Sequence, residues 1–341
     1  MKILYALQGT GNGHASRALE VIPHLQNRAD VDILISGYQC ELKFPFKITY
    51  KYHGLSFIFG KKGGIDFVQT LKKAKLTTLI NDIKTVPVEN YDLVINDFEP
   101  ITAWACKLKK VPLISLSHQN AVLDNNAPKY GLLKPERYIL KYYAPAKNKF
   151  GFHFKSYSSA TFLPIIRRDI RYKNPIKKDH YTVYLPAYSN KKIIAVLGNF
   201  KHIKWHVFSK HSKKTTIKNN ITIQPINSNE FMKSITTATG VLCGAGFETP
   251  AEALFLQKKL MVIPMKNQYE QQCNALALKE MGIPVLKKLH KKHITKIDKW
   301  IRNGKVIEVN YPDTTQDILD AIIAPYFNKP ITPQINLLKN T

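Results

Sequence analysis

The sequence contains little cysteine and no long hydrophobic run. Its four cysteines stand singly, at positions 40, 106, 243 and 273, without a CxxC pair or a histidine at metal-binding spacing. This pattern argues against a disulfide framework and against a structural zinc site. No apolar run approaches the roughly 18 residues of a membrane span, and no signal peptide precedes the first strand-like segment. We therefore expect a cytoplasmic protein that contacts a membrane only at its surface.

Acidic residues are also scarce. The chain has 24 Asp and Glu against 51 Lys and Arg, for a net charge of +27. Residues 131–218 contain 20 of the basic residues and only three acids, and aromatic side chains interleave with the basic ones up to position 157. This imbalance predicts an anionic partner. A lipid headgroup surface and single-stranded nucleic acid both fit, and a merely solvated basic face is the alternative.

Hydrophobic segments of strand length alternate with amphipathic segments of helix length along most of the chain. This alternation is typical of a parallel sheet covered by helices. It blurs where prolines interrupt residues 123–179, and then it restarts. We predict an α/β fold of two Rossmann-like domains that face each other across a cleft. The predicted bounds are a first domain 1–155, a linker 156–178, a second domain 179–320, and a tail 321–341 that could pack back on the first domain.

The first strand-like segment ends in a glycine-rich loop, QGTGNGHAS, at residues 8–16. The loop lacks the third glycine of a dinucleotide-binding fingerprint, and the second strand lacks the acidic residue at its end. A P-loop is excluded because no Lys-Ser or Lys-Thr pair follows. The glycines instead keep Cβ atoms away from the carboxyl end of the first strand, so that a ligand can approach the backbone closely.

His14 follows these glycines at the predicted start of a helix. The helix dipole disfavours protonation there, and a neutral imidazole suits a general base. Asp97 ends a later apolar strand, so we expect it at the same carboxyl edge, where it would orient His14; Glu99 could substitute for it. Simple helix capping by His14 or Asp97 remains open. The other candidates for the acceptor side of this edge are Gly11, Asn12, Gly13 and His118.

A second candidate site lies in residues 240–282. There a strand runs into Gly244 and Gly246, and the spacing predicts a helix with Thr249 as N-cap and Glu252 three residues later. Exposed amides at a helix start bind phosphate, although Thr249 and Glu252 also form a capping box that needs no ligand. The next helix would expose polar side chains in its first turn, either to hold sugar hydroxyls or simply to be solvated.

Together these segments resemble the nucleotide-sugar glycosyltransferases of the GT-B fold, in particular the family 28-like group of the peptidoglycan GlcNAc transferase and the galactolipid synthases. The pattern of that group is glycines, a Ser or Thr, an x-x-Glu, a proline after the next strand, and acid-Gln-x-x-Asn-Ala. The residues that match it here are Gly244, Gly246, Thr249, Glu252, Pro264, Glu270, Gln271, Asn274 and Ala275. The loop GTGNGH and the strand end NDFEP similarly resemble the first-domain motifs of such enzymes. The chain departs from some relatives at Gly244 and Ala245, where those carry His-Cys.

The resemblance implies roles for these residues. Amides from Gly246 through Phe247 to Thr249 would hold the diphosphate, Glu252 the ribose, and Glu270 with Gln271 the sugar hydroxyls. His14, supported by Asp97, would deprotonate the acceptor.

The resemblance also implies an activity. We expect an inverting, metal-independent glycosyltransferase without a cofactor, which moves a sugar from a nucleotide diphosphate sugar, most simply a UDP-sugar, to a lipid-linked or cell-envelope glycan. Residues 131–218 would rest on the anionic inner face of the plasma membrane. A nucleotide-sugar 2-epimerase is the alternative; a nucleic-acid-binding protein is a more distant one, and nucleic acid is an unlikely partner.

Overall fold

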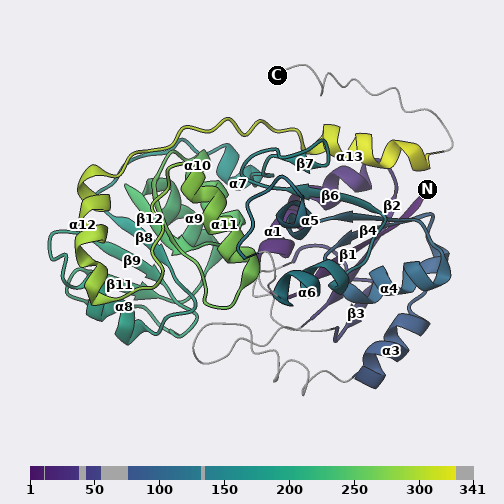
Figure 1. Ribbon diagram of the computed structural model, residues 1–341, viewed down its shortest axis with the longest axis horizontal. Helices are drawn as coiled ribbons and strands as arrows, with labels where there is room; N and C mark the ends of the chain where they lie inside the picture. Colours follow the sequence, from purple (N-terminus) through teal and green to yellow (C-terminus); the bar gives the residue numbers. More distant parts are fainter. Residues whose placement is uncertain (11, 38–43, 55–75, 132–134, 328–341) are drawn as a thin grey trace.

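The computed structural model of the chain describes residues 1–10, 12–37, 44–54, 76–131 and 135–327. Within them the chain forms two β-sheets with helices packed around each, and the two sheets lie side by side along the long axis of the molecule (Figure 1). The first sheet has the strand order β3-β2-β1-β4-β5-β6-β7, and the second has the order β10-β11-β9-β8-β12-β13. We refer to the two parts as the first and second halves.

All strand pairs of the first sheet are parallel. Its strands are β1 (Lys2–Gln8), β2 (Asp30–Ser36), β3 (Tyr50–Tyr52), β4 (Leu93–Asp97), β5 (Leu113–Leu116), β6 (Asn148–Phe152) and β7 (Thr161–Phe162). The helices of this half are α1 (Asn12–Gln26), α3 (Leu76–Thr85), η1 (Val88–Asn90), α4 (Pro100–Lys109), α5 (His118–Leu123) and α6 (Pro135–Tyr143). Strand β1 is buried along almost its whole length, as expected of a parallel strand with both faces covered.

The second sheet is parallel except for its edge pair β10 and β11. Its strands are β8 (Tyr181–Tyr184), β9 (Trp205–Phe208), β10 (Thr216–Lys218), β11 (Ile221–Gln224), β12 (Gly240–Gly244) and β13 (Lys259–Ile263). The helices that follow the first half are α7 (Arg168–Arg171), α8 (Asn190–Leu197), α9 (Ser228–Thr237), α10 (Glu248–Phe255), α11 (Tyr269–Glu280), η2 (Lys291–His293), α12 (Ile294–Asn303), α13 (Thr315–Ile323) and η3 (Ala324–Tyr326).

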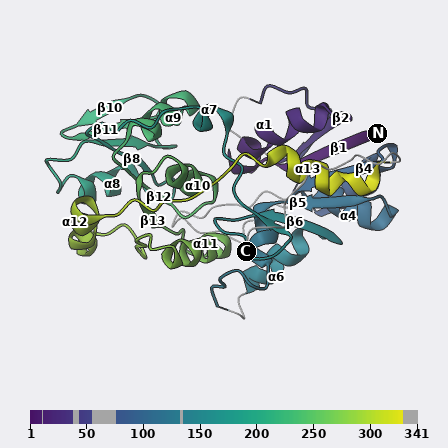
Figure 2. The ribbon, with the colours of Figure 1, turned by 90° about the horizontal axis from the view of Figure 1, so that it is seen from above.

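The bounds of the two halves differ from those expected from the sequence. Strand β7 extends the first sheet beyond residue 155, into the predicted linker, because its backbone pairs with β6. Helix α13 begins before the predicted tail and packs against α1 in the first half (Figure 2). Arg28, two residues after α1, donates two hydrogen bonds to the carboxylate of Asp320 on α13, at 3.0 and 2.7 Å. Residues 328–341 of the predicted tail lie outside the described residues.

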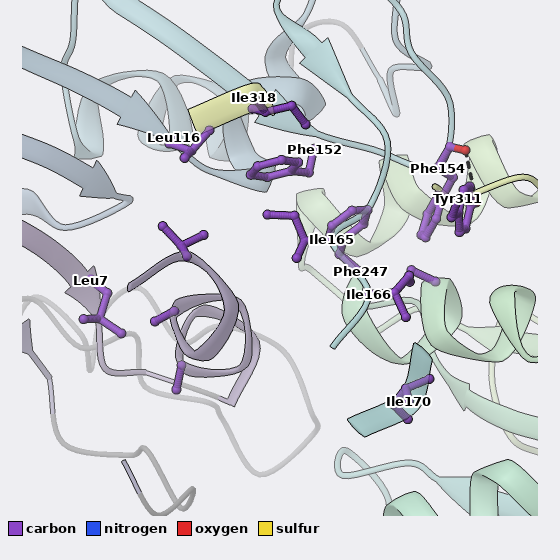
Figure 3. Packing of buried hydrophobic residues seen from close by; sticks show 14 of the residues in the cluster. Leu7, Leu116, Phe152, Phe154, Ile165, Ile166, Ile170, Phe247, Tyr311 and Ile318 are labelled. Carbon is purple, nitrogen blue, oxygen red and sulfur yellow. Dashed lines mark hydrogen bonds between the residues drawn. The ribbon is translucent and has the colours of Figure 1, made fainter. Parts of the chain in front are cut away.

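A continuous apolar core joins the two halves. It runs from Leu7 and Phe152 in the first sheet to Phe247 at the start of α10 (Figure 3). The hydroxyl of Tyr311, near the end of the chain segment that leads to α13, donates to the backbone carbonyl of Phe154 at 3.1 Å. Each large side chain buried in this way stabilises the contact by about 1.5–3 kcal/mol, so the halves are packed together and not merely tethered.

The strand orders determine where a ligand would bind. In an open parallel sheet, the binding crevice lies outside the carboxyl ends of two neighbouring strands whose connections leave in opposite directions. In the first sheet these strands are β1 and β4, and in the second sheet they are β8 and β12. The loops after β1, β4 and β12 contain the residues singled out in the sequence.

Candidate active site between the two halves

The side chains of His14 and Asp97 meet at the edge of the first sheet. Asp97 is the last residue of β4, and His14 stands in the first turn of α1. Nδ1 of His14 lies 2.8 Å from Oδ1 of Asp97, and the carboxylate has no exposed surface. An ionised Asp97 makes Nδ1 the donor, which leaves Nε2 as the ring nitrogen able to accept a proton. The pairing predicted from the sequence is therefore present in the geometry.

Burial works against the ionised form of Asp97, but two neighbours outweigh it. Desolvation alone would raise the pKa of the Asp97 carboxyl, whereas Arg17 and then His14 hold that pKa below its ordinary value. An ionised carboxylate at neutral pH fixes the tautomer of His14. The electrostatics thus favour the ionised Asp97 carboxylate that orients His14.

Arg17 is a site residue that the sequence reasoning missed. Its guanidinium donates from Nε to Oδ2 of Asp97 at 3.1 Å, and from Nη2 to Oδ1 at 2.9 Å. A third hydrogen bond, from Nη1, reaches Oε1 of Glu248 in the second half at 2.8 Å. The sequence did contain a signal for Arg17, because the spacing H-x-x-R from His14 places both side chains on one face of a helix.

Phe98 forms one wall beside His14. It follows β4 with φ of 57°, a left-handed conformation that is uncommon for a large side chain. Its ring is stacked on the imidazole of His14 at 6.3 Å between centroids, and on the ring of Tyr143 at 4.7 Å. Such backbone strain persists where packing over-determines it, often at functional sites. Tyr143 ends α6, so α6 adjoins the edge of the first sheet at which His14 lies.

The donor-side helix begins earlier than predicted. Helix α10 starts at Glu248, with Phe247 as its N-cap and no side-chain cap hydrogen bond. Thr249 is therefore the second helical residue and not the cap, so the predicted capping box does not form. A Cβ placed on Gly246 would meet no atom within 4 Å, and one on Gly244 would lie 3.6 Å from Oε1 of Gln271. Open space thus adjoins the first amides of α10.

Glu252 faces a cation instead of the cap amide. Its carboxylate accepts two hydrogen bonds from Arg167, at 2.6 and 3.0 Å, and it is 4% exposed. A carboxylate has about four lone-pair sites, so this pair occupies half of its acceptor capacity. Arg167 was also missed in the sequence, because its position in the irregular segment between β7 and α7 carries no pattern.

The first turn of α11 (Tyr269–Glu280) lies against both halves. Oε1 of Gln271 accepts from the backbone amide of Met265 at 3.0 Å, which fixes this side chain beside residues 244–247, the predicted donor loop. Oε2 of Glu270 accepts from Nε2 of Gln119 in the first half at 3.0 Å. The structure therefore brings these two predicted sugar ligands to the boundary between the halves, near residues 117–120 after β5.

Two predicted ligand residues have other roles. Glu99 is fully buried as the N-cap of α4, where its oxygens accept from the amides of Ile101 and Thr102 and from the hydroxyl of Ser36. His118 is 2% exposed, and its ring stacks on that of Phe247 at 4.1 Å. The side chains of Glu99 and His118 are thus structural, which corrects their assignment to the acceptor side. Phe247 was predicted to contribute its backbone amide to the donor site, and that role stays a prediction.

The glycine loop is only partly described. Gly11 lies outside the described residues. Asn12 begins α1, and a Cβ on Gly13 would stand 3.5 Å from Cγ of Glu248. That distance is ordinary van der Waals contact, so Gly13 lies directly beside α10, but the approach of this helix to the loop does not itself require a glycine.

Acidic residues do not gather at this edge as a metal site would require. Among the residues that the structure describes, no three His, Cys, Asp or Glu side chains could together hold a metal ion. The one D-x-D triplet of the sequence, Asp30 to Asp32, stands at the opposite, amino end of β2. There Asp32 accepts from Thr49 and Tyr91 at 2.8 and 2.7 Å. Metal independence stays a prediction.

Comparison with known proteins identifies the family. The sequence profile of glycosyl transferase family 1 matches residues 1–303. The chain belongs to this family. The glycosyltransferase assignment and the GT-B fold predicted from the motifs are confirmed. Among curated protein sequences, none matches the chain.

Solved structures share the fold of this family member at low sequence identity. MurG of Acinetobacter baumannii is 15% identical, with a TM-score of 0.58, over 94% of this chain and 99% of that one. SnogD, a glycosyltransferase of Streptomyces nogalater, is 11% identical, with a TM-score of 0.52, over 94% and 99%. The spinosyn rhamnosyltransferase SpnG, complexed with thymidine diphosphate, is 12% identical, with a TM-score of 0.54, over 96% of each chain. Because the similarity extends over nearly the whole chain, both sheets belong to the shared fold.

Proposed function

We propose that the protein transfers a sugar, with inversion, from a nucleotide diphosphate sugar to an acceptor hydroxyl. The observation that carries the proposal is the buried pair of His14 and Asp97 on one side of the boundary, opposite the open space over Gly246. The proposed base and the proposed phosphate-binding helix start then lie on either side of the boundary between the halves. The loop with His14 and the loop with Gly246 lie far apart in the sequence. Neither motif alone therefore indicates the reaction.

The chemistry follows from these positions. Nε2 of His14 removes the proton of the acceptor hydroxyl while its oxygen bonds to the anomeric carbon, and the bond from that carbon to the diphosphate oxygen breaks. The departing nucleoside diphosphate keeps the electron pair, and the first amides of α10 stabilise its charge. Thr249 lies in the same turn, where its hydroxyl would add a further donor. Neither a metal nor a cofactor is required by this scheme.

The sugar and ribose would bind nearby polar groups. Glu252 retains acceptor capacity for ribose hydroxyls beside Arg167. Oε1 of Gln119 and Oγ of Ser117 are buried without a hydrogen bond in the described structure, and such atoms indicate where ligand groups bind. Together with Glu270 they suggest the position of sugar hydroxyls. SpnG was solved with thymidine diphosphate, and we propose UDP as the first candidate here by resemblance.

A panel of nucleoside diphosphates and nucleotide sugars tests the donor assignment. We expect at least one UDP-, GDP- or dTDP-sugar to raise the melting temperature, because a ligand that binds only the folded state stabilises it. The adenine dinucleotides NAD and FAD are the control and should cause no shift. A panel in which no nucleotide sugar stabilises the protein would contradict the proposal.

The acceptor is proposed to be lipid-linked or part of an envelope glycan, reached at an anionic membrane. Helix α6 supports this choice, because its last residue packs on Phe98 beside His14 while Tyr138, Lys141 and Tyr142 are exposed on its surface. Aromatic and basic side chains together suit a lipid headgroup layer. No helix in the described part of the chain is long and apolar enough to cross a bilayer.

Sedimentation with lipid vesicles tests the membrane contact. We expect binding to vesicles that contain phosphatidylglycerol and much weaker binding to neutral phosphatidylcholine vesicles. Replacing Tyr138 and Tyr142 by Ser and Lys141 by Gln should reduce the bound fraction several-fold. The matched control replaces the exposed Lys296 and Lys299 of α12 by Gln, which should leave it nearly unchanged. Equal losses in both variants would indicate a nonspecific charge effect.

A further inference from the structure

Arg17 connects the predicted base to the donor-side helix. It is 3% exposed, and its three hydrogen bonds reach carboxylates on both halves, two on Asp97 and one on Glu248. Its guanidinium also lies over the ring of Phe152, 5.7 Å from the centroid. Burying a cation is costly unless it is fully paired, so the position of Arg17 depends on both carboxylates.

The guanidinium of Arg17, with its two parallel N–H donors Nε and Nη2 (its fork), fixes the Asp97 carboxylate that orients His14. Nη2 of Arg17 and Nδ1 of His14 both donate to Oδ1 of Asp97, while Nε of Arg17 holds Oδ2. Two parallel hydrogen bonds from a planar guanidinium determine the rotation of a carboxylate as well as its position. Asp97 therefore cannot turn away from His14 without breaking a buried bidentate pair.

We propose that Arg17 is a positioning residue, which aligns Asp97 with His14 while its link to Glu248 completes the arrangement from the second half. The inference rests on the proposed function of His14 as the base. Lysine would supply the charge but not the fork, and glutamine would supply neither.

The charges around Arg17 determine the direction of the effect. Burial raises the pKa of the Asp97 carboxyl, and the positive charge of Arg17 is the main cause that holds this pKa below its ordinary value. The other ionisable groups that face the cluster are His14 of α1, Tyr5 of β1, Glu248 of α10 and the paired Glu252 and Arg167. Removing the positive charge of Arg17 therefore raises the pKa of Asp97.

The first test compares Arg17→Gln and Arg17→Lys with wild type. We expect kcat to fall about 10- to 100-fold in both variants, because misaligned bases lose part of the usual general-base effect. In Arg17→Gln the acid limb of the kcat/KM profile should move to higher pH, because Asp97 loses the positive charge that holds its pKa down, whereas in Arg17→Lys it should stay. Unchanged kcat in Arg17→Lys would overturn the inference, even if Arg17→Gln failed to fold.

Arg28 provides the matched control. It also pairs through two hydrogen bonds with a carboxylate, that of Asp320, but it is about one-third exposed and touches no catalytic group. Arg28→Gln should keep the wild-type kcat and pH profile. If Arg17→Gln loses no more kcat than Arg28→Gln and its acid limb does not move, then Arg17 has only a structural role and the inference fails.

A measurement without substrate separates this inference from the proposed function. Aspartate labelled with ¹³C at its carboxyl carbon reports the protonation of Asp97 directly, with the signal assigned from its loss in Asp97→Asn. We expect the titration midpoint of this signal at higher pH in Arg17→Gln than in wild type, because Arg17 holds the pKa of Asp97 down. A midpoint that stays unchanged overturns the inference, whereas wild-type protein that transfers no sugar, or His14→Ala that still does, contradicts only the proposed function.

Discussion

Asn274 and His118 join the two halves by a buried hydrogen bond between Oδ1 and Nε2, at 2.9 Å. Asn274 also donates from Nδ2 to the carbonyl of Ala245 in the donor loop, at 3.1 Å. The asparagine of the matched motif is therefore not a ligand. It holds the donor loop against the strand end of the first half, which explains why an amide, with both a donor and an acceptor, is needed at this position.

Asn274→Ala should destabilise the protein. The change leaves Nε2 of His118 and the Ala245 carbonyl buried without partners, at a cost of about 2 kcal/mol or more. Unfolding in urea, followed by circular dichroism, measures the effect. Asn199→Ala removes an exposed amide that caps α8 and should cost less than 1 kcal/mol. Equal losses of unfolding free energy in Asn274→Ala and Asn199→Ala would show that the contact between the halves contributes no more to stability than a surface helix cap.

His14→Ala should abolish most transfer but preserve donor binding. Loss of a general base costs about 10²–10⁴ in rate, while the proposed donor site lies on the opposite side of the boundary. The measurement is kcat with the identified donor, together with its melting-temperature shift. Asp97→Asn should lower kcat as well, because it removes the charge that fixes the tautomer of His14. Wild-type rates in His14→Ala would show that His14 is not the general base.

Gly246→Leu should fold normally and lose nucleotide binding. A Cβ at this position meets nothing within 4 Å, and the larger side chain would fill the space over the start of α10. We expect a melting temperature within a few degrees of wild type and no shift with any nucleotide sugar. Gly151→Leu shows the contrasting result, since its Cβ would stand 2.5 Å from the amide of Ala121, and that variant should not fold. Nucleotide binding by Gly246→Leu would place the diphosphate elsewhere.

Glu248 should make stability depend on pH near neutrality. Burial, the largest cause, raises the pKa of its carboxyl to about 7, although Arg17 opposes the shift. The folded state then binds more protons than the unfolded state, so stability falls as pH rises from about 4.5 to 7 and levels off above. The shift corresponds to about 1–3 kcal/mol, since the side chain retains some exposure. Urea unfolding of wild type and Glu248→Gln across this range isolates the effect, and parallel curves would contradict it.

The fold was largely predictable because strand and helix periodicity is local. The alternation of apolar segments indicated two parallel sheets, and the carboxyl-edge rule placed His14 and Asp97 together although 83 positions separate them. The bounds were less predictable. Strand β7 has only two residues, Thr161 and Phe162, so its membership of the first sheet depends on pairing that no local pattern shows.

The composition of the site was harder to predict where contacts cross between the halves. The bond from Arg17 to Glu248 and the pair of Glu252 with Arg167 join residues 231 and 85 positions apart. Neither end of such a contact carries a signal in a single sequence. Glu99 was misassigned for the opposite reason, because a carboxylate just before Pro100 serves as a helix cap at least as readily as it serves as a ligand.

The chain crosses between the halves twice, in the segment around Arg171 and again around Tyr311 on the way to α13 (Figure 1). The two crossings are joined, since Nη1 of Arg171 donates to the carbonyl of Tyr311 at 2.9 Å. Two crossings that are bonded to each other restrict the relative rotation of the halves more than a single connection would, in addition to the apolar core between them.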